Sequence, residues 1–176
     1  MSTEEPQVTI SIRDYKPEDK EAVSQIFRDG LMHYSTIEGQ SEALWHGFIE
    51  HCLQEDFAGT CISSGGDFWV ATALENGEET VVGLVGFERK SDEEGELRRM
   101  SVKSSHRRHG VGRLLVAHLL DWAKAHDFKK VWLSSGDVMA PLAHKFYLSL
   151  GFTLQKIEPL PEDPTVQLHF FEKKLE

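Results

Sequence analysis

Cysteine is scarce in this chain of 176 residues, which contains only Cys52 and Cys61 and no Cys-x-x-Cys pair. Two cysteines are too few for a disulfide framework, so we expect two reduced thiols in a protein of the cytoplasm or the nucleus. Neither lies in a histidine pattern typical of a nucleophile. The nine histidines also lack the spacing of metal ligands, and the sequence therefore predicts no metal site.

Long apolar runs and an excess of basic charge are missing too. No run approaches the ~18 residues of a membrane-spanning helix, and the first seven residues lack the basic and apolar regions of a signal peptide. The chain has 19 basic and 29 acidic residues, which gives a formal net charge of -10. This balance disfavours nucleic acid and anionic membranes as partners.

What is present suits one globular domain. Hydrophobic residues make up 40% of the chain, enough for a core, and we find no repeat and no linker. We expect residues 1–176 to form a single domain, as a monomer or a homodimer.

Apolar periodicity and turn residues predict the order β-α-α-β-β-β-α-β-α-β-β. The expected strands are residues 8–13, 67–74, 80–87, 96–103, 130–134, 152–157 and 166–175. The expected helices are a stretch opened by Pro17, then residues 42–56, 110–126 and 139–150. Hairpins mixed with β-α-β crossovers predict an α/β (α+β) fold, with a central mixed sheet and helices on both faces.

Positive charge is concentrated at one strand-to-helix junction. No Asp or Glu occurs from Leu97 to Leu120, although the chain as a whole is acidic. The basic residues of this stretch are Arg98, Arg99, Lys103, Arg107, Arg108 and Arg113, with His106 and His109. Gly110 and Gly112 lie where the next helix begins, so unpaired N–H groups and the helix dipole meet there. Such a turn is typical of a phosphate or pyrophosphate site.

Two familiar phosphate-binding motifs fit this turn poorly. A Walker loop requires Gly-Lys-Ser or Gly-Lys-Thr, but Gly112 is followed by Arg113. A Rossmann fingerprint requires a third glycine where Leu115 stands, and an acidic residue further on. We therefore disfavour a nucleoside triphosphatase and a dinucleotide oxidoreductase.

The strand before the turn is irregular. Its apolar residues Leu97, Met100 and Val102 are spaced three and then two apart, whereas a regular strand keeps a spacing of two. A β-bulge near Arg98-Arg99 would restore a common face and would splay this strand from its neighbour at 130–134. The free edge could then bind an extended ligand that carries amides. Together with a pyrophosphate, this describes coenzyme A.

At this point the sequence resembles the GNAT superfamily of acyl-CoA-dependent N-acyltransferases. The matching segments lie within residues 96–152: Glu96-Leu-Arg-Arg-Met-Ser-Val102, Arg107-Arg-His-Gly-Val-Gly112, Val131-Trp-Leu133 and Ala143-His-Lys-Phe-Tyr-Leu-Ser-Leu-Gly-Phe152. The segment Met100–Arg107 is similar to the camello-like branch. The resemblance implies a single GNAT-like domain with a mostly antiparallel, twisted sheet of six or seven strands, and acetyl-CoA as co-substrate.

The resemblance also implies roles for individual residues. Backbone groups of Met100, Ser101 and Val102 would pair with the pantetheine. The pyrophosphate would be held by backbone N–H groups across Arg107, Arg108, His109, Gly110, Val111, Gly112 and Arg113. Tyr147 would act as the general acid that protonates the leaving thiolate. Glu96 is our candidate for the base that takes the proton of the amine.

One departure from the family pattern concerns the last signature helix. Many relatives carry Asn three residues before its alanine, but this chain has Ala140 followed by Pro141. We expect the contact of that Asn to be either absent or supplied by Ser134 or Ser135. We expect His144 and Lys145 on the solvent-facing side of the same helix.

Substrate recognition is expected in residues 33–56 and in the connection 157–165, which three prolines mark. The acidic surface would tolerate a cationic acceptor, such as a polyamine or a lysine side chain. The favoured function is acetyl transfer from acetyl-CoA to a primary amine, on a small molecule or a peptide. The alternatives are a catalytically weak acyl-CoA sensor or interaction module, and a nucleotide-binding regulator.

Overall fold

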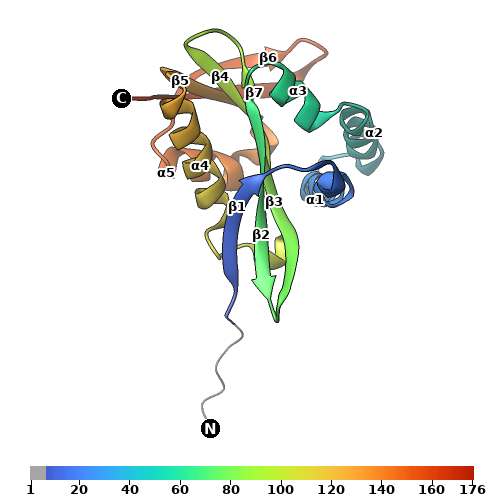
Figure 1. The fold of residues 1–176 in the computed structure, drawn as a ribbon. Coiled ribbons are helices and arrows are strands. Elements are labelled where there is room, and N and C mark those ends of the chain that lie inside the picture. Colours follow the sequence, from blue (N-terminus) through green and yellow to red (C-terminus); the bar gives the residue numbers. More distant parts are fainter. Residues whose placement is uncertain (1–6) are drawn as a thin grey trace.

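The computed structural model describes residues 7–176, which contain one seven-stranded sheet and five α-helices (Figure 1). The strands are β1 (Thr9–Asp14), β2 (Asp67–Glu75), β3 (Glu78–Arg89), β4 (Glu94–Val102), β5 (Lys130–Gly136), β6 (Thr153–Leu160) and β7 (Asp163–Lys174). The helices are α1 (Lys20–Met32), α2 (Glu42–Leu53), α3 (Phe57–Ser63), α4 (Val111–Ala125) and α5 (Lys145–Ser149). Within these residues, no helix has both the length and the apolar character needed to cross a membrane.

The sheet has the order β1-β2-β3-β4-β5-β7-β6. Among the described strands, β4 and β5 form the one parallel pair, and the other neighbours are antiparallel. The expected mixed, mostly antiparallel sheet is therefore confirmed, and each expected strand is found in its expected place.

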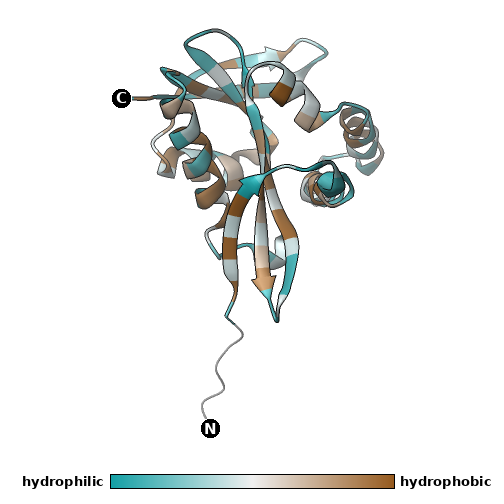
Figure 2. Cartoon of the chain, in the orientation of Figure 1, coloured by the Kyte–Doolittle hydropathy of each residue, from teal (hydrophilic) through white to brown (hydrophobic). Residues whose placement is uncertain are grey.

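Helices cover the sheet on both faces, as predicted. α4 packs on one face, and α1, α2 and α3 pack on the other (Figure 1). Successive residues of β2 belong to different cores: Trp69 and Ala71 lie in the core with α4, whereas Phe68 and Val70 lie in the core with α1 and α3. Strands buried on both faces carry apolar side chains on both, and Figure 2 shows hydrophobic residues along β2 and β3.

The second expected helix, over 42–56, is in fact two helices. α2 ends at Leu53, and α3 begins at Phe57. The side chain of Asp56 accepts a hydrogen bond from the backbone N–H of Gly59 at 3.1 Å, so Asp56 is the N-cap of α3. The apolar pattern continues across this capping side chain, so the sequence predicts one helix where the structure has two.

The expected helix over 139–150 is irregular at its start. Residues Asp137–Met139 form a 3₁₀ turn and Ala140–His144 form a π turn, so that only Lys145–Ser149 is regular α-helix. Pro141 lacks the N–H that a regular helix would need there. The expectation for His144 is wrong: its side chain is buried, whereas Lys145 is exposed.

The expected loop between the last two strands is mostly strand. β6 continues to Leu160 and β7 begins at Asp163, so Pro159 and Pro164 lie inside strands. β6 is at the edge of the sheet, where proline is tolerated because fewer ladder hydrogen bonds are needed.

Candidate active site

The parallel pairing between β4 and β5 stops soon after it begins. Glu94, Gly95 and Glu96 pair with β5, and the remainder of β4 separates from it. Beyond Glu96 the facing edges of the two strands do not pair with one another. Backbone groups on these edges are available to an extended ligand that carries amides.

A β-bulge turns β4 away from its neighbour. Between the pairs Leu84–Ser101 and Gly86–Arg98, two residues of β4 oppose one residue of β3. Arg99, one of the two, has a left-handed φ of 60°. The bulge expected at Arg98-Arg99 is therefore confirmed, and the opening between β4 and β5 follows from it.

The glycine turn opens α4. Gly110 is the N-cap, with a left-handed φ of 73°, and α4 begins at Val111. The first backbone N–H groups of the helix have no partner within it, and the positive end of the helix dipole lies at the same place. A Cβ on Gly112 would lie 3.1 Å from Cζ of Phe146, so glycine there permits close contact between α4 and α5.

The loop before this turn is fixed to the hairpin formed by β2 and β3. Nε2 of the buried His106 lies 2.5 Å from Oε1 of Glu75, and its Nδ1 lies 2.8 Å from Oγ of Ser105. One hydrogen-bonded histidine thus anchors the phosphate-binding turn to a distant strand end. Nothing in the sequence pattern indicated this contact.

A cleft of about 820 Å³ lies along the opening between β4 and β5. All expected site residues except His109 line it: Glu96, Met100, Ser101, Val102, Arg107, Arg108, Gly110, Val111, Gly112, Arg113 and Tyr147. The ring of His109 lies 6.1 Å from that of His106 instead. The volume is in the range of sites for large cofactors.

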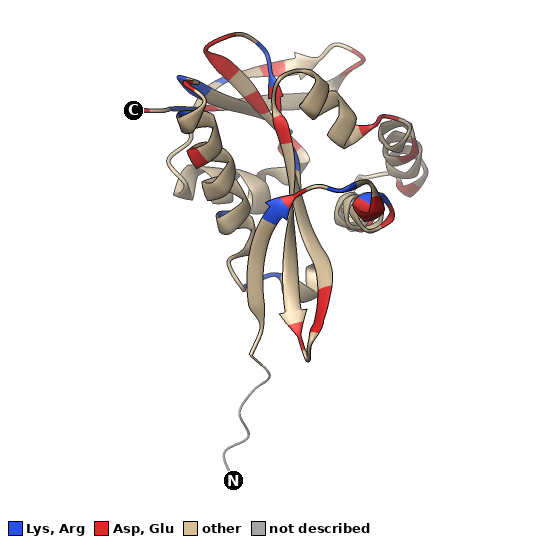
Figure 3. Cartoon of the chain, viewed as in Figure 1, with Lys and Arg blue, Asp and Glu red and all other residues tan. Residues whose placement is uncertain are grey.

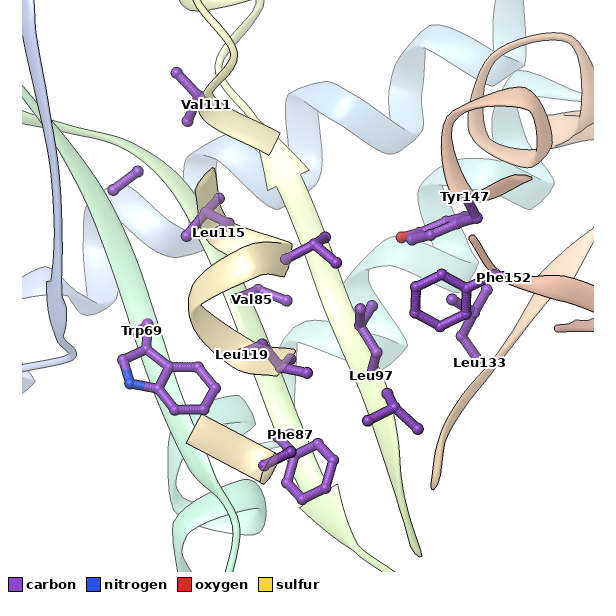
Figure 4. Packing of buried hydrophobic residues seen from close by; sticks show 14 of the residues in the cluster. Trp69, Val85, Phe87, Leu97, Val111, Leu115, Leu119, Leu133, Tyr147 and Phe152 are labelled. Carbon is purple, nitrogen blue, oxygen red and sulfur yellow. The ribbon is translucent and has the colours of Figure 1, made fainter. Parts of the chain in front are cut away.

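Tyr147 lines this cleft. Its side chain is 7% exposed, and its ring packs against Phe146 and Phe152 with centroid distances of 5.2 and 5.7 Å. Figure 4 shows the hydroxyl directed from α5 towards β4. Burial, and to a lesser extent the nearby Tyr34, raise the pKa of Tyr147 well above its usual value. The phenol is protonated at neutral pH, as it is at its ordinary pKa, and burial makes it a weaker acid.

Glu96 lines the cleft at the point where the strands separate. One of its carboxylate oxygens lies 3.3 Å from Nζ of Lys90, which also contacts Glu88 at 3.0 Å. The side chain of Glu96 is 16% exposed. The candidate base is thus largely buried and ion-paired, a fact that the sequence could not show.

Other acidic residues neutralise part of the basic segment. Arg98 Nη1 lies 2.5 Å from Glu88, and Arg99 Nη2 lies 2.5 Å from Glu55. The guanidinium of Arg99 also lies 4.3 Å from the ring centroid of Phe57. Arg107 and Arg108, by contrast, are exposed at the turn. The charge available for phosphates is therefore concentrated at the start of α4.

The two serines proposed to replace the family asparagine differ in their surroundings. Ser135 is buried, and its hydroxyl donates to Sδ of Met139 at 3.4 Å. Ser134 is exposed, and both serines line the cleft. Ser134 is therefore the better candidate for a contact with a ligand.

His144 lies buried in the π turn that precedes α5. Nε2 of the buried His144 has no hydrogen-bond partner within the described residues, and its ring lies 4.6 Å from that of His169. Burial and His169 lower the pKa of His144, which favours the neutral form.

Across residues 7–176, no group of three or more metal-ligating side chains is found.

Comparison with known proteins gives a family match. The sequence model of the Acetyltransferase (GNAT) family matches residues 28–152. Human N-acetylaspartate synthetase is 39% identical over 128 residues, which cover 70% of this chain and 39% of that protein. Rat N-acetyltransferase 8 is 32% identical over 117 residues, which cover 61% of this chain and 50% of that protein. The chain thus spans half or less of the length of these relatives.

Solved structures share the whole fold. PaiA N-acetyltransferase from Thermoplasma acidophilum, in complex with coenzyme A, has a TM-score of 0.75 at 19% identity, covering 94% of this chain and 99% of that one. An acetyltransferase of the GNAT family from Staphylococcus aureus has a TM-score of 0.71 at 22% identity, covering 96% and 100%. With the match over residues 28–152, these observations show that the chain belongs to the GNAT acetyltransferase family.

Proposed function

We propose that this chain is a single acetyltransferase domain, residues 1–176, which transfers an acetyl group from acetyl-CoA to a primary amine. The observation that carries the proposal is the opening between β4 and β5, whose cleft is lined both by the phosphate-binding turn and by Tyr147. Family membership supports the same reaction. The PaiA relative was crystallised with coenzyme A, which supports the choice of co-substrate.

The residues present fit coenzyme A by their chemistry. The start of α4 offers unpaired N–H groups and the exposed Arg107 and Arg108 for a pyrophosphate. The free edge of β4 from Met100 to Val102 offers backbone donors and acceptors for the amides of a pantetheine arm. Among the charged side chains that line the cleft, Glu96 is the single acid, and it lies away from the turn, at the narrow end of the opening.

The proposed chemistry is direct attack in a ternary complex. The lone pair of a neutral amine attacks the thioester carbon, a C–N bond forms, and the C–S bond then breaks. Tyr147 donates its proton to the departing sulfur. Glu96 accepts the proton that the amine loses, directly or through water, and passes it to solvent, while solvent returns one proton to the Tyr147 phenolate, so that no net proton is released. The products are an N-acetyl amide and a free thiol.

A second candidate function is a weakly catalytic acyl-CoA sensor or interaction module. The ion pair between Glu96 and Lys90 and the alanine at position 140 are the observations that favour it. Both functions require the cofactor to bind, but only the enzyme releases thiol in the presence of an amine.

A turnover assay separates the two functions. The purified chain is mixed with acetyl-CoA and a panel of primary amines, and thiol release and amide formation are followed together. The proposal predicts amine-dependent release of thiol in equal amount to the amide. Tight binding of acetyl-CoA without amide formation from any amine would instead support the sensor.

A further inference from the structure

The outer part of the cleft has an apolar wall on the side of α1 and α2. Its residues come from α1, from the following 3₁₀ turn (His33–Thr36) and from α2: Phe27, Gly30, Leu31, His33, Tyr34 and Phe48. None of these residues is Asp, Glu, Lys or Arg. A ligand that contacts this wall meets mainly aromatic and aliphatic surface.

The aromatic part of the wall is held in place by contacts within it. Tyr34 stacks on Trp45 with a centroid distance of 5.7 Å, and Trp45 lies edge-on to Phe48 at 6.0 Å. Nε1 of Trp45 donates a hydrogen bond to Gln40 at 2.9 Å, which fixes the indole. Phe48 is nevertheless 51% exposed. Its ring is thus positioned beside the cleft with half of its surface free for another apolar group.

The charges that line the cleft are opposite in sign to the charge of the whole chain. The lining contains the five arginines Arg98, Arg99, Arg107, Arg108 and Arg113, and one acidic residue, Glu96. Acidic residues lie elsewhere, on the β2–β3 hairpin, on the turn before β4 and on α1 and α2 (Figure 3). Glu96 is itself paired with Lys90.

This distribution bears on the kind of amine that can enter. A polyamine brings two or more positive charges, and beyond its reacting nitrogen each charge would find no unpaired carboxylate in the lining. Arg98 and Arg99 are already paired with Glu88 and Glu55, and the phosphates of bound coenzyme A would face the arginines of the turn, so the lack of free carboxylates is what disfavours a polyamine. The net charge of -10 therefore does not describe the cleft. An amine with a single nitrogen and an apolar body needs no second carboxylate and uses the exposed face of Phe48.

We propose that the acceptor is a monoamine with an aromatic or apolar body, which packs against Phe48 and Tyr34 while its nitrogen lies near Glu96. The inference rests on the proposed function and specifies the acceptor class of the same site. Phe48 is then a specificity-determining residue, because it contacts the body of the acceptor and is not itself part of the phosphate-binding turn.

The test compares two probes on the full chain saturated with coenzyme A. Calorimetry measures the binding of 2-phenylethylamine and of spermidine, and steady-state kinetics with acetyl-CoA measures KM and kcat for each. We expect 2-phenylethylamine to bind at least about tenfold more tightly. Phe48→Ala should weaken its binding about fivefold or more, through loss of buried apolar surface, with an unchanged KM for acetyl-CoA. Ile62→Ala is the matched control, because Ile62 is 49% exposed on α3 and does not line the cleft.

Three outcomes would overturn the inference. The first is that spermidine binds as tightly as 2-phenylethylamine or more tightly, and the second is that Phe48→Ala behaves like Ile62→Ala. The third is that neither amine binds although coenzyme A does. Each of these three outcomes contradicts the inference about the acceptor and leaves the proposed function standing. If coenzyme A itself fails to bind, the proposed function is wrong, and the inference falls with it.

Discussion

At the scale of single residues, the hydroxyl of Tyr147 bears most directly on the proposed chemistry. Its ring is buried between Phe146 and Phe152, and the phenol is protonated at neutral pH. No side-chain hydrogen bond within the described residues engages this hydroxyl. The proton is therefore free to be donated to an incoming atom.

Tyr147→Phe should lower kcat about 100-fold, near the low end for loss of a general acid, and leave KM for acetyl-CoA nearly unchanged. Phenylalanine fills almost the same volume, so the melting temperature should stay close to that of the wild type. Steady-state kinetics with the best amine provide the measurement. A kcat within twofold of the wild type would assign Tyr147 a packing role only.

Gly110 offers a test of the phosphate site that separates charge from shape. Its φ is 73°, a conformation that Asn and Asp tolerate better than other side chains, and a Cβ there would meet nothing within 4 Å. Gly110→Asp should weaken acetyl-CoA binding at least about 100-fold, because its carboxylate would face the pyrophosphate. Gly110→Asn has the same size without the charge and should cost much less. Equal affinity in the two variants would place the phosphates elsewhere.

At the scale of elements, the phosphate-binding turn depends on a contact with the end of β2. Glu75 holds His106, and His106 precedes the exposed residues 107–110. The contact joins residues 31 positions apart in the chain. The turn is therefore positioned by the sheet as well as by its own glycines.

Replacing Glu75 should loosen this turn. Glu75→Gln removes a charged acceptor from a buried histidine, and we expect KM for acetyl-CoA to rise several-fold while kcat changes little. Glu78→Gln, on the same hairpin at an exposed position, is the control. A fall in kcat with KM unchanged would be inconsistent with a positioning role in cofactor binding.

The start of α3 gives a prediction for stability. Asp56 is its N-cap, and Asp56→Ala leaves the N–H of Gly59 without its partner. We expect a loss of about 1 kcal/mol in the free energy of unfolding, measured by urea denaturation. Asp56→Asn keeps an acceptor oxygen and should retain most of the stability. No difference between Asp56→Ala and the wild type would mean that the cap does not stabilise the fold.

The same elements show how far a sequence determines a site. The bulge at Arg98-Arg99 and the turn at Gly110 were predictable, because each leaves a local mark: a break in alternation, and glycines at a helix start. Glu55, which pairs with Arg99, lies 44 positions away in the chain. No helical or strand periodicity relates the two residues, so the pair becomes visible only in the folded structure. α3 was missed because apolar residues continue across its cap, and the length of β6 was missed because prolines usually mark loops.

At the scale of the whole molecule, a partly buried ion pair ties the beginning of α1 to β1. Arg13 Nη1 lies 2.8 Å from Asp19, and the hydrogen bond from Arg13 lowers the pKa of this carboxyl. A lowered pKa means that the folded state favours the ionised form. The pair thus stabilises the fold at neutral pH, and this contribution is lost as the pH falls through the lowered pKa.

Asp19→Asn should therefore destabilise the fold at pH 7 by about 1.5–3 kcal/mol, the range for hydrogen bonds to charged groups. The difference from the wild type should shrink below about pH 4, where the carboxyl of the unfolded chain becomes protonated. Urea denaturation at a series of pH values provides the measurement. A difference that stays constant from pH 7 to pH 3 would contradict this assignment.

The central claim is that the opening between β4 and β5 binds acetyl-CoA, and thermal unfolding with and without this ligand tests it most directly. At about 100 times its dissociation constant, acetyl-CoA should add ~2.7 kcal/mol of stability, which for a chain of this size is a rise in Tm of about 5–10 °C. The same concentration should raise the Tm of Gly110→Asp by no more than about 1–2 °C. No shift of the wild-type Tm at millimolar acetyl-CoA, or a shift with ATP and none with coenzyme A, would contradict the account.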